Sequence, residues 1–144
     1  MRTSRIATVL GTATAATLLA IGPSSAFTLE YDHAGTTPWP SSSGARCGSS
    51  SAVHSCFRSN GDWFSITDLK SDGHSAVVRW RSYDPKTNVL NRGGIIWNTG
   101  GLNAVRYQNK NLPEGDFVEW EMCTGEFSTK HVIENSCVTM SAHA

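Results

Sequence analysis

The sequence predicts a small all-β protein, an antiparallel β-sandwich or barrel held together by two disulfides. Three observations support this fold class. Apolar and polar residues alternate in several short runs, which is typical of half-buried strands. Turn-forming Gly, Pro, Asn and Asp residues separate these runs, and no segment shows the apolar period of a helix. The chain also has four cysteines, an even number that suits two disulfides.

Residues 1–26 have the pattern of a secretory signal peptide. A basic start precedes an apolar, small-residue run over 6–21, and the small residues of 24–26 suit cleavage by signal peptidase. The run is too short and too rich in threonine to favour a membrane anchor. We therefore expect a secreted chain that begins at Phe27 and has 144 − 26 = 118 residues, enough for one domain.

Residues 27–46 are predicted to be an extended N-terminal arm and linker. Phe27, Leu29 and Tyr31 alternate with polar residues as in one short strand, and a linker rich in Pro, Ser, Gly and Thr follows, with Trp39 between two prolines. Three fates are open for this strand. It can pair with the edge of its own sheet, bind a partner protein as an added strand, or stay disordered.

The β-sandwich domain is predicted to cover residues 47–144 and to be organised around residues 56–80. There, two alternating runs flank a Lys-Ser-Asp-Gly sequence at 70–73, which is typical of a tight hairpin turn. Trp80 and Trp120 fall on the apolar sides of their strands and are predicted core residues. The predicted strands are Trp63–Leu69, His74–Tyr83, Gly94–Asn98, Leu102–Gln108, Asp116–Cys123 and His131–Met140.

The cysteines Cys47, Cys56, Cys123 and Cys137 all follow the predicted signal peptide, so we expect disulfides. Of the three possible pairings, Cys47–Cys56 with Cys123–Cys137 is favoured, because each pair flanks one turn-rich segment. A zinc site is the alternative. It is disfavoured because the chain has no Cys-x-x-Cys pair and His54 is the only histidine near a cysteine. We expect no metal and no cofactor.

The charge of the chain gives no reason to expect nucleic acid or a membrane as a partner. The sequence has 12 basic and 12 acidic residues. Without the two arginines of the predicted signal peptide, the basic count is 12 − 2 = 10 and the formal net charge is −2. The basic residues are scattered along the chain, whereas phosphate-binding surfaces concentrate them.

No catalytic residues are expected from the motifs. No serine has the glycine-flanked context of a nucleophile elbow, and His74 beside a turn aspartate is explained by turn chemistry. Glu119 and Glu121 share one side of a strand at about the carboxylate spacing of glycoside hydrolases. Arg79 and Arg81 form a complementary pair on another strand, so cross-strand ion pairs explain the glutamates without catalysis.

The domain resembles a known group of proteins through three features: CFRSNGDWF at 56–64, DLKSDGHSAVVRW at 68–80, and the closing pair of Cys123 and Cys137. Together they resemble small secreted bacterial β-sandwich proteins with four or more cysteines. Some of these look like the adaptor subunits of umbrella-shaped toxin particles. The resemblance implies a protein that joins a lectin-bearing, inactive trypsin-like subunit to the stalk of a large toxin subunit, with its extended N-terminus inserted into one partner.

Two classes of function follow from these observations. The first is a non-catalytic secreted adaptor that binds other secreted proteins, among them a large toxin subunit and a lectin-bearing subunit. Its partner-binding residues would be Phe27, Leu29, Tyr31 and Trp39. The second is a small secreted hydrolase or enzyme inhibitor that acts through a face of the sandwich. A carbohydrate-binding module that uses Trp63 or Trp97 is a further alternative.

Overall fold

The computed structural model describes residues 27–144, and the predicted signal peptide lies outside them. Within this range every regular element is a strand. The nine strands are β1 (Glu30–His33), β2 (Arg46–Ser49), β3 (Val53–Arg58), β4 (Trp63–Asp68), β5 (Ser75–Tyr83), β6 (Leu90–Asn98), β7 (Val105–Asn109), β8 (Phe117–Glu126) and β9 (His131–His143).

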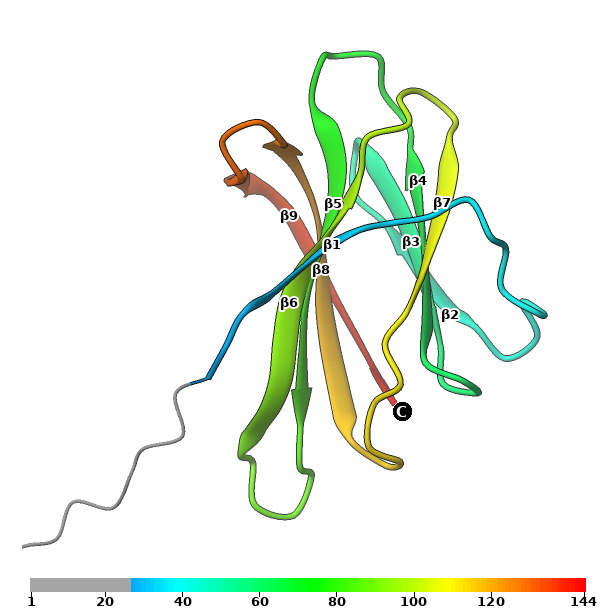
Figure 1. Ribbon diagram of the computed structural model, residues 1–144, viewed down its shortest axis with the longest axis vertical. Coiled ribbons are helices and arrows are strands. Elements are labelled where there is room, and N and C mark those ends of the chain that lie inside the picture. The colour runs from blue at the N-terminus through cyan, green and yellow to red at the C-terminus, as the bar shows by residue number, and fades with distance from the viewer. Residues whose placement is uncertain (1–26) are drawn as a thin grey trace, which may run out of the picture.

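The strands form two sheets that pack face to face (Figure 1). The five-stranded sheet has the order β1-β6-β5-β8-β9, and the four-stranded sheet has the order β2-β3-β4-β7. Neighbouring strands are antiparallel, except that β1 runs parallel to β6. The all-β prediction is confirmed, and of the two predicted architectures the structure is the sandwich.

The core lies between the two sheets and is rich in aromatic residues. Trp80 and Trp120 are fully buried from the five-stranded sheet, as predicted, and they meet Phe57 and Phe64 of the four-stranded sheet. The ring centroids of Phe64 and Trp80 are 6.3 Å apart, and those of Phe57 and Trp120 are 5.8 Å apart. Alternation along the strands therefore directs the large apolar side chains inward, where aromatic pairs add to the free energy of burial.

The predicted hairpin over residues 56–80 is wrong. The chain does reverse at Gly73, whose φ is +82°, but β4 pairs with β3 and β7, whereas β5 pairs with β6 and β8. The six residues 69–74 between β4 and β5 carry the chain from one sheet to the other. The reason is that both strands have an apolar side, and stacking the two sides face to face buries both of them.

Strand boundaries also differ from the prediction. The sequence does not predict the β2–β3 hairpin, because the serine-rich residues 46–55 look like a turn-rich segment. Thr124-Gly125 was predicted as a turn but lies inside β8, and the chain turns at 127–130 instead. A Cβ at Gly125 would lie 2.6 Å from the carbonyl oxygen of His131 and 3.0 Å from the Trp97 ring. This glycine therefore marks a close approach of the backbone.

Both predicted disulfides are confirmed. Cys47–Cys56 joins directly opposite residues of β2 and β3. Cys123–Cys137 joins β8 to β9 at the place where their register shifts, between Met122 and Thr124. Two disulfides in a domain of this size are typical of extracellular proteins.

Candidate interaction site

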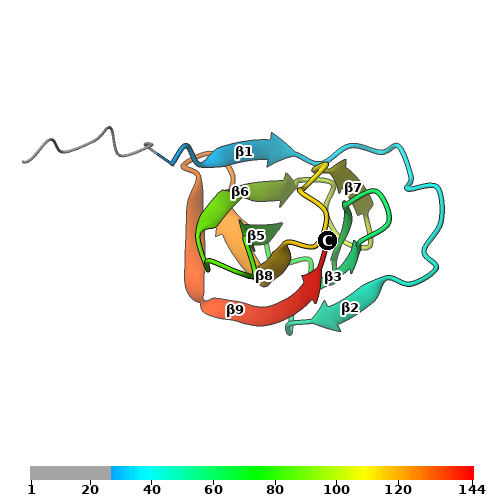
Figure 2. The same cartoon turned by 90° about the horizontal axis from the view of Figure 1, so that it is seen from below.

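The N-terminal strand β1 lies in the sheet of its own chain, which is the first of its three possible fates. It forms one edge of the five-stranded sheet, and Glu30 and His33 face Gly94 and Trp97 of β6. Seen along the sandwich, β1 crosses the side of the molecule from β6 toward β7 (Figure 2). Gly35 then exchanges two backbone hydrogen bonds with Tyr107 of β7, of 2.9 and 2.8 Å.

The inward side of β1 is held by four charged residues, which we call the β1 ion-pair group: Glu30, Asp32, Arg92 and Lys110. The Lys110 ammonium donates to Glu30 at 2.6 Å and to Asp32 at 2.7 Å. Arg92 donates to both carboxylate oxygens of Glu30, at 2.8 and 3.0 Å. The Lys110 side chain is only 4% exposed, and its Nζ lies 4.8 Å from the centre of the Trp80 ring.

The electrostatics of this group favour charged carboxylates. Burial by itself raises the pKa of Glu30, but hydrogen bonds from Arg92 and Lys110 outweigh burial, and the pKa lies below its ordinary value. Two carboxylates face two cations here, so the group is neutral as a whole. A buried lysine that is compensated in this way stabilises the docked position of β1.

The outward side of β1 and the residues before it carry the predicted partner-binding residues. We call Phe27, Leu29 and Tyr31 the outer row. They are 45%, 38% and 57% exposed. The Phe27 ring lies against β6 at Gly93, where an added Cβ would be 3.0 Å from Cζ of Phe27. The structure thus keeps these three apolar side chains on the surface while it holds the strand in the sheet.

Among residues 27–144, no strand pairs with the outer edge of β1. The Ala34 N–H donates to the carbonyl of Trp97 at 2.9 Å. In a parallel ladder, hydrogen bonding to one neighbour falls on alternate residues, so the even-numbered residues of β1 bond to β6. The main-chain groups of Tyr31 and His33 therefore point away from β6. An unpaired strand edge of this kind can accept a strand from another chain.

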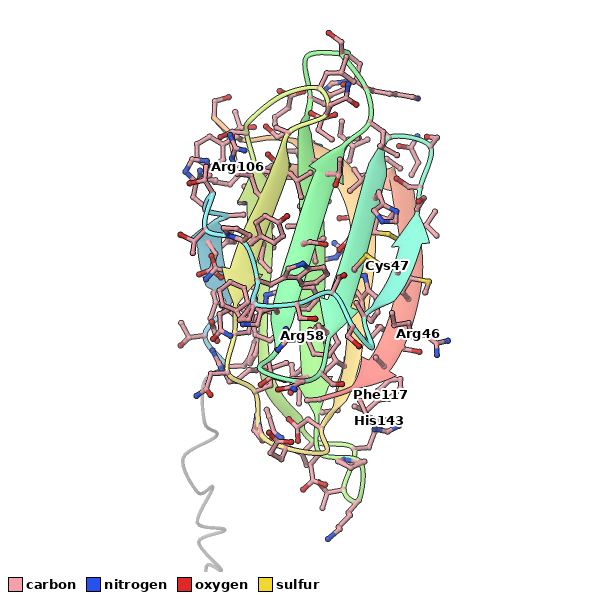
Figure 3. All side chains as sticks on the ribbon, turned by 90° about the vertical axis from the view of Figure 1, so that its right-hand side faces the viewer. Arg46, Cys47, Arg58, Arg106, Phe117 and His143 are labelled. Carbon is pink, nitrogen blue, oxygen red and sulfur yellow. A yellow bond between two sulfur atoms is a disulfide. The ribbon has the colours of Figure 1, made fainter. Side chains whose placement is uncertain are left out.

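Trp39 lies in the linker, which crosses the outer face of the four-stranded sheet. In Figure 3 the linker passes over β7 and β4 toward β2, with Arg58 beside it. Trp39 is half-buried, and its ring centroid is 5.8 Å from that of Tyr107. Arg58 donates to the carbonyl of Ser41 at 2.6 Å. Trp39 thus contacts its own domain and is a less accessible candidate for partner binding than the outer row.

The predicted charge pairs on the outer face of the five-stranded sheet are present. Arg79 donates to Glu121 at 2.5 Å and binds both carboxylate oxygens of Glu134, at 2.7 and 2.8 Å. Arg81 lies 3.5 Å from Glu119. Hydrogen bonds from Arg79 lower the pKa of Glu134. The carboxylates that resembled a glycosidase pair are therefore engaged in cross-strand ion pairs.

A polar cavity of about 260 Å³ lies between the β4–β5 and β6–β7 loops. Asp68 and Asn98, both buried, contribute to its walls, together with the partly exposed His74. Nδ1 of His74 is 2.5 Å from the Glu126 carboxylate, and the His74 N–H donates to Asp72 at 3.1 Å, as expected for a turn. In the described residues no serine hydroxyl is hydrogen bonded to His74.

The structure also shows the surroundings of the residues considered as zinc ligands and as carbohydrate-binding residues. The ligand atoms of Cys47, His54 and Cys56 lie within 4.8 Å of one another. Both sulfur atoms are in the disulfide, so neither is a thiolate ligand in this structure. Trp97 is 1% exposed and packs against Phe127, so its ring offers no face for a sugar, while Trp63 is half-buried.

The chain matches no protein-family model, no curated protein and no solved structure. In residues 27–144 there is no helix long and apolar enough to cross a membrane.

Arg92 and Lys110 are the residues of the candidate site that the sequence did not reveal. They lie 62 and 80 positions from Glu30, so no local pattern links them to the arm. One signal was present: Glu30 and Asp32 alternate with the outer row, so one side of the predicted strand is acidic. An acidic side on a strand that docks in a sheet requires basic partners.

Proposed function

We propose that this protein is a secreted, non-catalytic interaction protein that binds another secreted protein through the outer row of its N-terminal segment. The observation that carries the proposal is the exposure of Phe27, Leu29 and Tyr31 beside a free strand edge. Single exposed apolar residues are common, but here three alternate along a strand and the residues just before it, and ion pairs to the buried Lys110 hold that strand. Aromatic residues in such positions often dominate binding energy.

The chemistry of the surface indicates the kind of partner. A strand or extended peptide that added to the free edge at Tyr31 and His33 would gain main-chain hydrogen bonds and cover the outer row at once. The resemblance to adaptor subunits suggests that the partner is a lectin-bearing subunit or a large toxin subunit. In that case the protein joins subunits of a secreted toxin complex. Two disulfides suit a protein that works outside the cell.

The proposal is tested with surface variants that leave the β1 ion-pair group intact. The tagged mature protein is incubated with culture supernatant of its native source, and captured proteins are identified by mass spectrometry. Leu29→Ser and Tyr31→Ser should each lose the stoichiometric partner. Val89→Ser is the matched control, because Val89 is as exposed as Tyr31, at 57%, and lies outside the N-terminal segment.

The expected loss of binding free energy follows from alanine substitutions at other protein interfaces. Loss of a dominant aromatic contact costs about 2 kcal/mol or more, which is about a 30-fold weaker Kd. If the wild-type protein captures no stoichiometric partner, or if Tyr31→Ser captures it as well as Val89→Ser does, the outer row is not the binding surface.

A second candidate function is the binding of a small polar ligand, such as one sugar unit, in the cavity between the β4–β5 and β6–β7 loops. The cavity combines hydroxyl, amide, imidazole and carboxylate groups, which is the mixture that fixes a polyhydroxylated ligand. On a glycan array, retention should then be lost in His74→Ala and unchanged in Tyr31→Ser. The opposite pattern would assign any glycan binding to the outer row.

A further inference from the structure

The Cys47–Cys56 disulfide differs from Cys123–Cys137 in its access to solvent. Cys47 is exposed on the short edge strand β2, and Figure 3 shows it on the outer face of the four-stranded sheet. Its partner Cys56 is 6% exposed. In contrast, Cys123 is fully buried in an apolar cluster with Trp97, and Cys137 packs against that cluster. An incoming reagent therefore reaches a sulfur atom of the first disulfide more easily.

A histidine lies beside the buried sulfur of this accessible disulfide. Nε2 of His54 is 3.4 Å from Sγ of Cys56. On the other side of the ring, Nδ1 lies 2.8 Å from the Ser49 hydroxyl. A serine hydroxyl that donates to Nδ1 leaves the ring proton on Nε2, where it points to sulfur. His54 is thus positioned to donate to Cys56 if that sulfur becomes a thiolate.

We propose that Cys47–Cys56 is a site of thiol–disulfide exchange with small thiols, assisted by His54. The thiolate attacks Sγ of Cys47 and forms a new sulfur–sulfur bond as the bond to Cys56 breaks. The electron pair of the broken bond goes to Sγ of Cys56. The Nε2–H of His54 donates a hydrogen bond to the departing thiolate, and solvent then supplies the proton that makes it a thiol.

The product is a mixed disulfide on Cys47 and a free thiol on Cys56. An N–H that donates a hydrogen bond to a thiolate lowers the pKa of that thiol, and a thiol of lower pKa is a better leaving group. Attack at Cys47 is favoured by exposure, and departure of Cys56 is favoured by His54, so both effects select the same direction. This inference is independent of the proposed function, because the disulfide lies on the other sheet from the outer row.

The test compares the two disulfides within one molecule. The oxidised protein is incubated with reduced glutathione, quenched with an alkylating reagent, digested and analysed by mass spectrometry. Cys47–Cys56 should open about tenfold faster than Cys123–Cys137, given the leaving-group effect and the difference in access. Cleavage after Arg46 and Arg58 places both cysteines in one peptide, residues 47–58. Fragmentation should locate the glutathione on Cys47.

Two variants separate the role of His54 from simple exposure. His54→Phe keeps a ring but removes the donor, and it should slow opening of Cys47–Cys56 about threefold for each unit by which the thiol pKa rises. His54→Gln keeps an N–H donor and should recover part of the rate. The opening rate of Cys123–Cys137 in the same samples, and thermal unfolding of the oxidised variants, show whether the fold is intact.

Equal rates for the two disulfides in the wild-type protein would overturn the proposal without any variant. Glutathione found on Cys56 would reverse the direction of attack. An unchanged rate in a folded His54→Phe protein would show that exposure alone governs the reaction and that His54 has no part in it.

Discussion

Lys110 shows how a single residue positions the candidate site. Its side chain is almost fully buried, yet it carries a charge that water would otherwise solvate. Glu30 and Asp32 supply two carboxylates within 2.7 Å, and the face of Trp80 supplies a third favourable contact. Removal of one partner from such a group leaves the others uncompensated, which is the costly case for buried charges.

Replacement of this lysine tests the contribution of the β1 ion-pair group. Lys110→Met keeps the packing against Trp80 and removes the charge. We expect a loss of about 1–3 kcal/mol in unfolding free energy, less than for a fully buried pair, because Glu30 and Asp32 keep some contact with water. Chemical denaturation measures it. The exposed Lys86→Met is the control, within about 0.5 kcal/mol of wild type, and equal losses in the two variants would contradict the assignment.

The stability of the protein should fall at acid pH through Glu30. Its folded pKa lies below the 4.5 of an unperturbed glutamate. Its contribution is therefore present above about pH 4.5 and is lost as the pH falls through the lower, folded value. Burial raises the pKa of Asp62, so that group acts in the opposite sense. Denaturation midpoints measured from pH 6 to 3 should fall less steeply in Glu30→Gln. A slope identical to that of wild type would exclude a contribution from Glu30.

At the scale of elements, the pairing of β1 with β6 depends on a glycine. Gly94 faces Glu30, and a Cβ added there would lie 2.6 Å from the Glu30 carbonyl oxygen and 2.9 Å from its Cβ. Both are far inside ordinary contact distance, and the carbonyl is backbone that cannot swing aside. The absence of a side chain at this position therefore lets the acidic side of β1 approach the sheet.

Gly94→Ala should loosen β1 selectively. We expect a cost of about 1–3 kcal/mol, with faster amide exchange in residues 27–34 than in the rest of the sandwich. Gly35→Ala is the matched control, because its nearest atom would be the Tyr107 carbonyl oxygen at 3.9 Å. Hydrogen–deuterium exchange measures both. Uniform exchange along the Gly94→Ala chain would contradict the assignment.

The same variant separates two ways in which the partner can bind. If β1 stays in the sheet and the outer row binds in place, Gly94→Ala should weaken binding, because the row is no longer held. If β1 leaves the sheet to enter the partner, the variant should strengthen binding, since less free energy is needed to release the strand. Titration of the captured partner against Gly94→Ala and Gly35→Ala gives the answer.

At the scale of the whole molecule, the N-terminal part of the chain connects both sheets. β1 extends the five-stranded sheet, Gly35 bonds to β7, and the linker then crosses the outer face of the four-stranded sheet before β2 begins (Figure 3). Trp39 and the contact of Arg58 with Ser41 hold the linker there. Contacts to both sheets therefore hold β1 and the linker that follows it.

Loss of the Trp39 contact should affect this connection more than the core. Trp39→Ala removes a half-buried ring from Tyr107, and we expect a loss of about 1–2 kcal/mol, below the cost for a fully buried aromatic residue. Limited proteolysis should cut the linker within residues 36–45 sooner than in wild type. Thr37→Ala, an exposed linker substitution, is the control. Equal cleavage rates would show that the ring does not hold the linker.

Much of the fold could be predicted from the sequence, because alternation along each strand and the even number of cysteines are visible without the structure. They predicted an all-β domain, the inward direction of Trp80 and Trp120, both disulfides and the charge pairs between β5 and β8. The disulfides join cysteines only 9 and 14 positions apart, and the buried tryptophans and the charged rows of β5 and β8 follow the side-chain period that any β-sheet imposes.

Only the tertiary structure decided how these pieces are assigned to sheets. The turn near Gly73 predicts a reversal of the chain. It does not show whether the next strand pairs with the previous one in the same sheet or lies in the opposite sheet, and β4 and β5 lie in opposite sheets. The place of β1 was likewise open. The position of β1 depends on Arg92 and Lys110, which bind Glu30, and on Gly94, which leaves room for Glu30 because glycine has no side chain. These residues meet only in the folded chain. Contacts between residues this distant in the chain leave no periodic trace. The sequence therefore determined the apolar outer row, and the fold determined that the row stays exposed at a strand that is paired in the sheet.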